Sequence, residues 1–423
     1  MDRRGRPAIG LDFGTTNTVL AIHEPDGATQ VIRFPTPAGA PTSSFRTVLS
    51  FAGSAAAVEA GPFAIEAFLD DPQETRLIQS FKSFAASRAF SGTSIFGKRF
   101  QFEDLLYVFL RRMLSHAERP ETASARTVVG RPVVFAGADP EEALALTRYE
   151  TAIRRAGLED FRFTYEPVGA AFYFARRIQA SAVVMVADFG GGTSDFSLMR
   201  FRRTAEGLQA EPLSRSGVGI AGDAFDFRII DELVSPRLGK GTSYRSGHKS
   251  LPVPARYYST FACWSQLALM KGSREMREIR EIARTAEDKA GVGRFLELLE
   301  DDHGYPLYQA VTAAKEALSS AERTRFRFEA GSIRIEADVS RTDFEGWIRR
   351  ELEAIERTME QALAGAGLRV GDVDKVFLTG GSSLVPALRD MFTARFGAAR
   401  IETGGEFESI ASGLAQIAAD DSG

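Results

Sequence analysis

The clearest pattern along the chain is a pair of apolar segments, each interrupted by a short polar turn. Residues 9–22 consist of two apolar runs that are separated by the turn Asp12-Phe13-Gly14-Thr15-Thr16-Asn17. Continuous apolar runs are typical of strands buried on both faces, so we predict a strand, a tight turn and a second strand running back. Residues 183–201 repeat the arrangement around Asp188-Phe189-Gly190-Gly191-Gly192-Thr193. The repeat predicts two related half-domains. Their turns are expected to face each other and to bind a polyphosphate from opposite sides.

The rest of the chain alternates strands with amphipathic helices, which is the order of an α/β layer. The pattern predicts strands at 47–51, 126–135, 161–165 and 376–378, and a hairpin at 326–339. It predicts helices at 103–117, 166–178, 273–289, 309–321, 343–363 and 410–418. In the first of these, Leu106, Phe109, Leu110 and Met113 share one face.

Capping residues predict where two of the helices begin. Asp139 is expected to be the N-cap of a helix that has Pro140 in its first turn and that Gly157 ends. In the helix 343–363, Thr342 and Glu345 are expected to form a capping box.

These elements group into two lobes. We predict lobe I over 1–180, with a core of 8–34 and 122–180 and an insertion subdomain of about 35–121. Lobe II covers 181–423, with a core of 181–230 and 307–420. Its insertion, about 231–306, is charged and helical and has no strong strand signal. A chain of 423 residues is long enough for two or three such cores.

Composition limits the function classes. The net charge of −4 gives no electrostatic reason to expect nucleic acid or an anionic membrane as the main partner. No secretory signal and no apolar run of about 18 residues is found, so we expect a soluble, cytoplasmic protein. The single cysteine, Cys263, lies in an apolar context and excludes an internal disulfide. The four histidines, including His248 and His303, lie far apart and lack metal-ligand spacing.

The polar turns have the chemistry of a phosphate site. Backbone N–H groups in glycine-rich turns form concave anion sites, which explains Gly14 and the triplet 190–192. Hydroxyls of Thr15, Thr16 and Thr193 can donate to phosphate oxygens, and Asp12 and Asp188 suit Mg²⁺. Gly380-Gly381-Ser382-Ser383 before a helix suits a nucleoside or phosphate. Each turn taken alone is equally consistent with an ordinary tight turn. Neither a Walker P-loop nor a nucleophile elbow occurs.

Five segments stand in the order of the nucleotide-site motifs of the actin/hexokinase/heat-shock-protein-70 superfamily. They are Asp12–Asn17, Glu166–Ala171, Asp188–Asp195, Gly219–Asp226 and Thr379–Pro386. The first and third resemble DnaK-type chaperones in particular. The resemblance covers nearly the whole chain but only the ATPase half of such a chaperone, so the chain most resembles the short, YegD-like members without a peptide-binding domain. It implies an α/β, actin-like ATPase fold, with two lobes that each hold a duplicated ribonuclease-H-like mixed sheet flanked by helices.

The resemblance also implies a role for each matching residue. Lys82 and Glu166 would orient and assist the attacking water, and Pro167 would report the nucleotide state. Asp12 and Asp188 would hold Mg²⁺, and Asp188 and Thr193 would join the catalytic set. The remaining residues would bind ATP or ADP: Gly14, Thr15, Thr16, Asn17, Gly190, Gly191, Gly192, Gly222, Asp223, Lys315, Ser319, Gly380, Gly381 and Ser382. Glu316 and Leu384 stand where chaperones place the arginines that sandwich the adenine, so base specificity is left open.

The expected function is therefore a Mg²⁺-dependent, slowly hydrolysing ATPase of the chaperone type. We expect a monomer with an unidentified protein client or co-chaperone. Three alternatives stay open at this point. One is a small-molecule, sugar-type kinase of the same superfamily, and another is a nucleotide-binding adaptor without catalysis. The third is a filament-forming actin-like protein, although the helical insertion at 231–306 favours the chaperone type.

Overall fold

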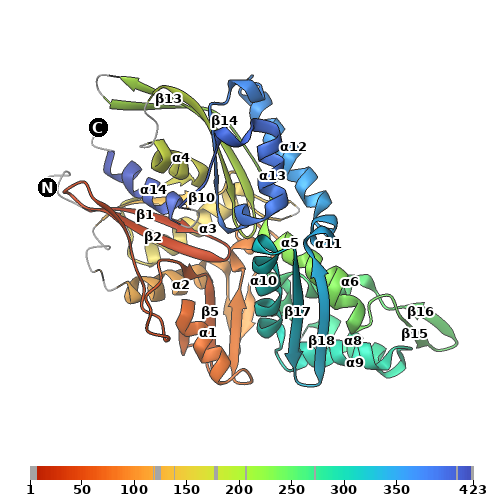
Figure 1. Cartoon of the computed structure of the whole chain (residues 1–423). Coiled ribbons are helices and arrows are strands. Elements are labelled where there is room, and N and C mark those ends of the chain that lie inside the picture. Colours follow the sequence, from red (N-terminus) through yellow and green to blue (C-terminus); the bar gives the residue numbers. More distant parts are fainter. Residues whose placement is uncertain are drawn as a thin grey trace. The chain divides into compact units, whose positions relative to one another are not determined.

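The chain folds into two compact units (Figure 1). The structure, a computed structural model, describes residues 7–117, 119, 125–137, 139–175, 180–204, 207–270, 273–405 and 408–420. Unit 1 comprises Met1–Gly222 and Glu353–Gly423, and unit 2 comprises Asp223–Leu352. The lobe boundaries drawn from the sequence stay a prediction.

Unit 1 is built on two mixed sheets. The first has the order β11-β10-β1-β2-β3, with β4 also pairing with β2. Its strands are β1 (Ala8–Phe13), β2 (Asn17–His23), β3 (Thr29–Val31), β4 (Phe45–Arg46), β10 (Arg126–Arg131) and β11 (Phe161–Tyr165). The second has the order β14-β13-β12-β19-β20. Its strands are β12 (Ala182–Phe189), β13 (Ser194–Thr204), β14 (Gly207–Val218), β19 (Lys375–Thr379) and β20 (Ile401–Glu402).

The two sheets have the same topology. In each, three consecutive strands form an antiparallel meander, and two later strands add in parallel beside the first strand of the meander. The duplicated mixed sheet expected from the sequence is therefore confirmed.

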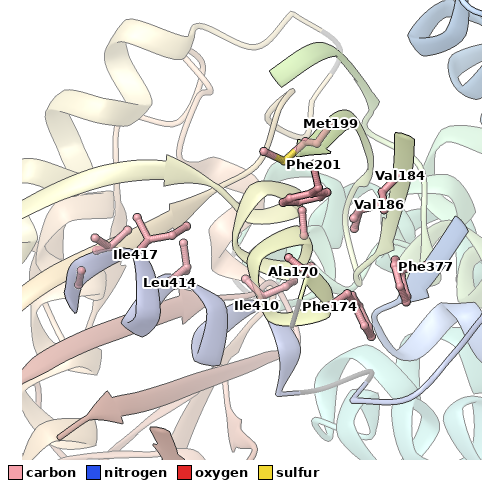
Figure 2. Packing of buried hydrophobic residues seen from close by; sticks show 14 of the residues in the cluster. Ala170, Phe174, Val184, Val186, Met199, Phe201, Phe377, Ile410, Leu414 and Ile417 are labelled. Atoms are coloured by element: carbon pink, nitrogen blue, oxygen red, sulfur yellow. The ribbon is translucent and has the colours of Figure 1, made fainter. Parts of the chain in front are cut away.

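Two helices pack against each other in the core that both sheets share (Figure 2). Helix α14 (Ser409–Asp420) packs on β1, β2 and β10, and α4 (Glu166–Ala175) packs on β12 and β13. The cluster joins Val128 of the first sheet, Phe377 of the second, Phe174 of α4 and Leu414 of α14. The helices approach closely because glycine lies at the crossing: a Cβ on Gly413 would lie 1.7 Å from the carbonyl oxygen of Gly169.

The other elements of unit 1 lie between the strands of the two sheets along the chain. The helices are α1 (Gly61–Asp70), α2 (Phe102–His116), α3 (Glu142–Arg155) and α13 (Pro386–Phe396), with the 3-10 turns η2 (Phe81–Phe84), η6 (Val370–Asp372), η7 (Gly381–Leu384) and η8 (Ala398–Arg400). The strands are β5 (Val48–Ala52), β6 (Val58–Ala60), β7 (Thr75–Gln79), β8 (Thr93–Ile95) and β9 (Lys98–Phe100). The apolar face expected for α2 is buried.

Unit 2 is mostly helical and has its own core. Its helices are α5 (Gly222–Ile229), α6 (Ala255–Phe261), α7 (Trp264–Met270), α8 (Arg274–Thr285), α9 (Lys289–Glu300), α10 (Gly304–Ser320) and α11 (Arg341–Trp347), and α12 (Arg349–Gly365) leads back to unit 1. Short helical turns occupy Ile230–Val234 and Ser235–Leu238. Its strands are β15 (Ser243–Ser246), β16 (Lys249–Pro252), β17 (Arg323–Ala330) and β18 (Ile333–Ser340).

The capping predictions were wrong at both helices. Helix α3 begins at Glu142 rather than after Asp139, because Glu141 donates its N–H to the Ala86 carbonyl and pairs with Arg88, which holds it outside the helix. The second capping box consists of Ser340 and Asp343 instead of Thr342 and Glu345, since β18 runs directly into α11.

The predicted helix 343–363 is two helices separated at Ile348. The sequence places six apolar residues on one face of it, and five of them are buried: Phe344, Ile348, Ile355, Met359 and Leu363. The sixth, Leu352, is partly buried. The strand expected at 126–135 ends at Arg131, because Pro132 has no N–H for the ladder.

Several strands were missed: the short strands β3, β4, β6, β7, β8, β9 and β20, and also β14, β15 and β16. Strand β14 is an edge strand that contains Pro212 and many polar residues, so it lacks the apolar pattern of a buried strand. Strands β15 and β16 correct the expectation of an insertion without strands; they are short and largely exposed, and Gly247 in their turn has a φ of +60°. The end predicted for the helix 166–178 lies outside the described residues, which show α4 to Ala175.

Candidate functional site

The two predicted hairpins have matching geometry. In the first, Asp12 pairs with Val19 and Phe13 with Thr18, and residues 14–17 form the turn. In the second, Asp188 pairs with Asp195 and Phe189 with Ser194, and residues 190–193 form the turn. Each turn therefore has four residues, and the two aspartates occupy equivalent places one pair back from it.

The turns of the two hairpins lie against each other. A Cβ on Gly192 would lie 2.9 Å from the Oγ1 atom of Thr15, so a larger side chain there would displace this hydroxyl. Within the second turn, the Gly190 N–H donates to the Thr193 carbonyl at 3.1 Å. Thr15 and Thr193 are both buried. The facing turns are what the sequence repeat predicted.

A third loop joins this site behind the second hairpin. Gly380 has a φ of +80°, and a Cβ there would lie 2.3 Å from the Phe189 carbonyl oxygen and 2.8 Å from Asp188 Oδ1. The Ser382 hydroxyl donates to the Gly190 carbonyl at 2.9 Å, and the Gly222 N–H donates to the same carbonyl at 3.2 Å. Residues from three distant segments thus converge on the Asp188–Gly190 corner.

Lys82 and Glu166 form a buried ion pair in the same unit. Lys82 lies on η2, and Glu166 is the first residue of α4, directly after β11. The Lys82 Nζ atom lies 2.8 Å from Glu166 Oε1, and the side chains are only 7% and 5% exposed. The Lys82 ammonium also lies 5.7 Å from the ring centre of Phe13, the residue after Asp12.

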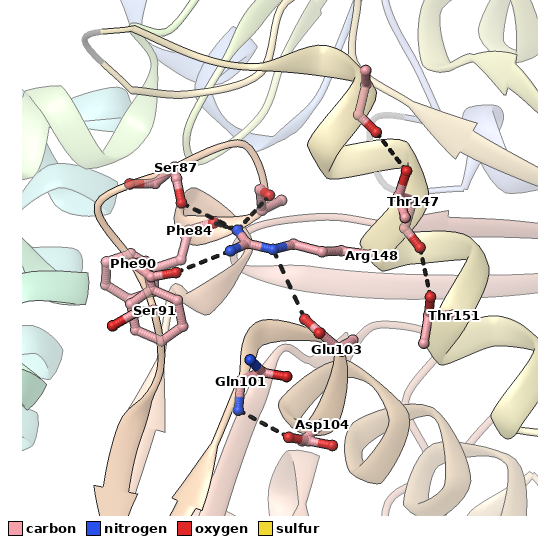
Figure 3. Close-up of polar contacts among 12 residues, drawn as sticks. Phe84, Ser87, Phe90, Ser91, Gln101, Glu103, Asp104, Thr147, Arg148 and Thr151 are labelled. Carbon is pink, nitrogen blue, oxygen red and sulfur yellow. Dashed lines mark hydrogen bonds and ion pairs between the residues drawn. The ribbon is translucent and has the colours of Figure 1, made fainter.

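Arg148 holds the segment that carries Lys82 (Figure 3). From α3, its guanidinium donates to the carbonyls of Phe84, Ala85, Ser87 and Phe90 at 2.9–3.2 Å. Its Nε lies 3.8 Å from a Glu103 carboxylate oxygen. A planar guanidinium suits this task because its donors form a fixed fork. The role of Arg148 was not predicted from the sequence, because nothing local marks an arginine that satisfies backbone carbonyls some sixty residues away.

The carboxylates of the site, of which Asp188 and Glu166 are buried and Asp12 is partly exposed, strongly affect one another. Burial and the charge of Glu166 raise the pKa of Asp12 to about 7, against a smaller lowering by Lys82. Burial, Glu166 and Asp12 raise the pKa of Asp188 well above its usual value. For Lys82, burial lowers the pKa, but Glu166 and its other neighbours outweigh that effect and the pKa is raised. The site therefore has a surplus of negative charge that one lysine does not balance.

Asp195 is a further buried carboxylate that the sequence analysis quoted only as the end of a motif. Its Oδ1 atom accepts the N–H groups of Val133 and Val134 at 2.7 and 3.3 Å, which ties the second hairpin to the loop after β10. Burial and Glu166 raise its pKa to about 7, although hydrogen bonds from Thr193, Val133 and Val134 lower it. Its position opposite Asp188 in the ladder was the available signal.

Comparison with known proteins decides the family. The model of the family described as Hsp70 protein matches residues 74–241 and 298–423, which is well over half of the chain. The chain belongs to the Hsp70 protein family. Its fold is therefore the actin-like ATPase fold, and it carries a nucleotide-binding ATPase domain of the Hsp70 chaperone type.

Hsp70 relatives among curated proteins match over most of this chain. The "Chaperone protein DnaK" of Thermosipho melanesiensis is 25% identical over 99% of the chain and 60% of its own length. The "Heat shock 70 kDa protein 7, chloroplastic" of Arabidopsis thaliana is 25% identical over 90% of the chain and 48% of its own length. The chain thus spans about half to three fifths of these relatives.

The predicted Hsp70 site residues divide between the two units. Unit 1 brings together the residues of the two hairpins, Lys82, Glu166, Gly222 and the loop of Gly380, Gly381 and Ser382. Asp223 opens unit 2, and Lys315, Glu316 and Ser319 lie on its helix α10. There, Lys315 Nζ lies 2.6 Å from Asp226 Oδ1. Leu384, at the end of η7 in unit 1, is 49% exposed. No helix of the described residues has the length and apolar character that a membrane crossing requires.

Proposed function

We propose that this protein binds ATP together with Mg²⁺ between the two hairpin turns and hydrolyses it slowly, as an ATP-driven switch of the DnaK type. The observation that supports this most is the contact of two matching turns, Gly192 against Thr15, beside the buried Lys82–Glu166 pair. Facing glycine-rich turns present N–H groups and hydroxyls to one polyphosphate from two sides.

The residues present suit a magnesium ion. Asp12 and Asp188 supply oxygen ligands, which Mg²⁺ prefers. Both have a raised pKa, so a divalent cation would relieve the negative charge that the fold concentrates there. When bound, the ion would neutralise charge on the phosphate oxygens.

In the proposed reaction, water attacks the γ-phosphorus of ATP, the bond to the bridging oxygen breaks, and ADP and inorganic phosphate leave. Lys82 would hold the water through its ammonium, and Glu166 would keep that ammonium in place through the 2.8 Å pair. Thr15, Thr193 and the N–H groups of the turns would hold the phosphates. This is catalysis by positioning and charge, which is what phosphoryl transfer requires of a protein.

The biological setting is also a proposal. Two relatives are named chaperone protein DnaK, which supports a protein client or a co-chaperone as the partner of the switch. We propose a monomer that acts in the cytoplasm, as expected from the sequence.

Substitution of Lys82 tests the catalytic part of the proposal. In the Lys82→Ala protein we expect ATP binding within a few-fold of wild type, but single-turnover hydrolysis at least about 100-fold slower, because the water loses its positioning group. Lys98→Ala, at an exposed lysine of β9, is the matched control and should hydrolyse ATP normally. Unchanged hydrolysis in Lys82→Ala would contradict the proposed mechanism and favour the non-catalytic adaptor.

A further inference from the structure

A second cluster of ionisable side chains lies in unit 2, away from the residues assigned above. Glu297 is in the last turn of α9, Asp301 follows that helix, and His303 precedes α10. One ligand atom from each of the three lies within 4.8 Å of the other two. Two carboxylates and an imidazole form a mixed oxygen and nitrogen ligand set.

The imidazole of His303 has an unsatisfied nitrogen. Its Nε2 atom is buried and forms no hydrogen bond with any residue that the structure describes. A buried ring nitrogen without a partner is costly, so it indicates a group that is held there.

This nitrogen and the Glu297 carboxylate face the same space. A Cβ built on Gly331, in the turn between β17 and β18, would lie 3.0 Å from His303 Nε2 and 2.2 Å from Glu297 Oε1. Gly331 has a φ of +55°, so glycine is required both by the backbone and by the space that these two groups occupy.

The Glu297 carboxylate is held in place. Its Oε1 accepts the Ser332 N–H at 2.5 Å, and its Oε2 accepts the Ser332 hydroxyl. Asp301 is exposed and can rotate toward the other two ligands. Bonds of about 2.0–2.2 Å to a shared ion need ligand atoms within about 4 Å of one another, so only a small rotation is required.

We propose that Glu297, Asp301 and His303 bind a first-row transition-metal cation, with Zn²⁺ as the preferred occupant and water completing its coordination. Imidazole nitrogen favours Zn²⁺ over Mg²⁺, which prefers an all-oxygen octahedron. Bound there, the ion cross-links the α9–α10 junction, and through Ser332 it also fixes the tip of the β17–β18 hairpin. Its role is structural and separate from ATP hydrolysis.

The test uses the full chain, freed of metal by a chelator and free of nucleotide. Titration with Zn²⁺ and with Co²⁺, whose absorption reports its coordination, should give one site per chain. We expect the affinity to fall at least about 10-fold in His303→Gln and in Asp301→Asn. His248→Gln, in the turn between β15 and β16, is the matched histidine control and should bind as wild type does. Asp188→Asn should also keep the site, which separates it from the proposed magnesium site.

A second readout is thermal unfolding followed by tryptophan fluorescence, since both tryptophans, Trp264 and Trp347, lie in unit 2. Saturating Zn²⁺ should raise the unfolding midpoint by at least about 3 °C in wild type and in His248→Gln, and by less than 1 °C in the two site variants. Asp301 is exposed, so its substitution tests the site without disturbing the core. Zn²⁺ affinity that is unchanged in His303→Gln, or no binding at micromolar Zn²⁺, would overturn the proposal.

Discussion

Lys82 is a buried lysine that forms an ion pair with Glu166. With Glu166 left in place, the change Lys82→Met leaves a carboxylate 5% exposed and without its ammonium. Breaking a buried ion pair on one side costs about 3–5 kcal/mol, so we expect the free energy of unfolding in urea to fall by that amount.

The double variant Lys82→Met/Glu166→Gln is the control for this change. It removes both charges, so most of the lost stability should return. A double variant that is no more stable than Lys82→Met would show that the charge of Glu166 is not what destabilises the single variant.

The raised pKa of Asp12 predicts a pH dependence of stability that is opposite in sign to that of most carboxylates. Its pKa is about 7 in the fold against 3.8 in the unfolded chain, so the folded protein binds the extra proton between about pH 4 and 7. Stability must then fall as the pH rises through this window. At pH 7.5, without nucleotide or divalent metal, we expect Asp12→Asn to be more stable than wild type by about 1–2 kcal/mol, allowing for partial exposure.

The same comparison at pH 4.5 should show a smaller difference, because Asp12 is then protonated in the folded wild type. Asp70→Asn, at an exposed carboxylate of α1, should show no such pH-dependent gain. A destabilised Asp12→Asn protein at pH 7.5 would contradict the assignment of Asp12 as a carboxylate that is strained without its cation.

At the scale of elements, the crossing of α4 and α14 depends on glycine. Gly413→Ala would place a methyl group 1.7 Å from the Gly169 carbonyl oxygen, which forces the helices apart. We expect a loss of about 3 kcal/mol or more in urea unfolding. Gly346→Ala in α11, where no atom lies within 4 Å, should instead be neutral or stabilising by up to about 1 kcal/mol. Equal effects of the two substitutions would argue against this crossing.

The position of η2 depends on the fork of Arg148. Arg148→Lys keeps the charge but cannot reach four carbonyls with one ammonium, so we expect about 2–3 kcal/mol of lost stability. Because η2 carries Lys82, hydrolysis should also slow about 10-fold while ATP binding changes little. Arg154→Lys on the same helix, an exposed pair with Glu150, is the control. A normal rate of hydrolysis in Arg148→Lys would remove the positioning role.

Elements with a strong apolar signal could be predicted from the sequence. The β1–β2 and β12–β13 hairpins were predicted correctly, because their continuous apolar runs have few alternative explanations. The edge strand β14 could not be, since an edge strand tolerates polar residues and Pro212. The start of α3 was misplaced for a different reason: tertiary contacts of Glu141 with Ala86 and Arg88 outweighed the local preference of Asp139 for a cap.

At the scale of the whole molecule, unit 2 is one continuous segment with its own core. Trp264 is buried there, and its indole N–H donates to Asp226 at 3.1 Å. We expect residues 223–352, expressed alone, to fold cooperatively with the blue-shifted fluorescence of a buried tryptophan. Emission typical of exposed tryptophan, without a cooperative transition, would show that this segment needs the rest of the chain.

The candidate site was predictable in its local parts and not in its long-range ones. The repeated turns predicted a phosphate site because glycine, threonine and aspartate recur at the same spacing. The contact of Lys82 with Glu166 joins residues 84 positions apart. The resemblance to chaperones assigned both residues to the attacking water, but nothing in the sequence predicted their ion pair. Neither a local pattern nor the resemblance to chaperones predicted the role of Arg148.

Binding of ATP with Mg²⁺ by the two hairpins can be measured by calorimetric titration of ATP, with and without Mg²⁺, into wild type and Asp188→Asn. We expect binding to wild type that needs Mg²⁺ and that is weakened at least about 10-fold by the substitution. Absence of nucleotide binding, or binding of equal strength in Asp188→Asn, would contradict this expectation.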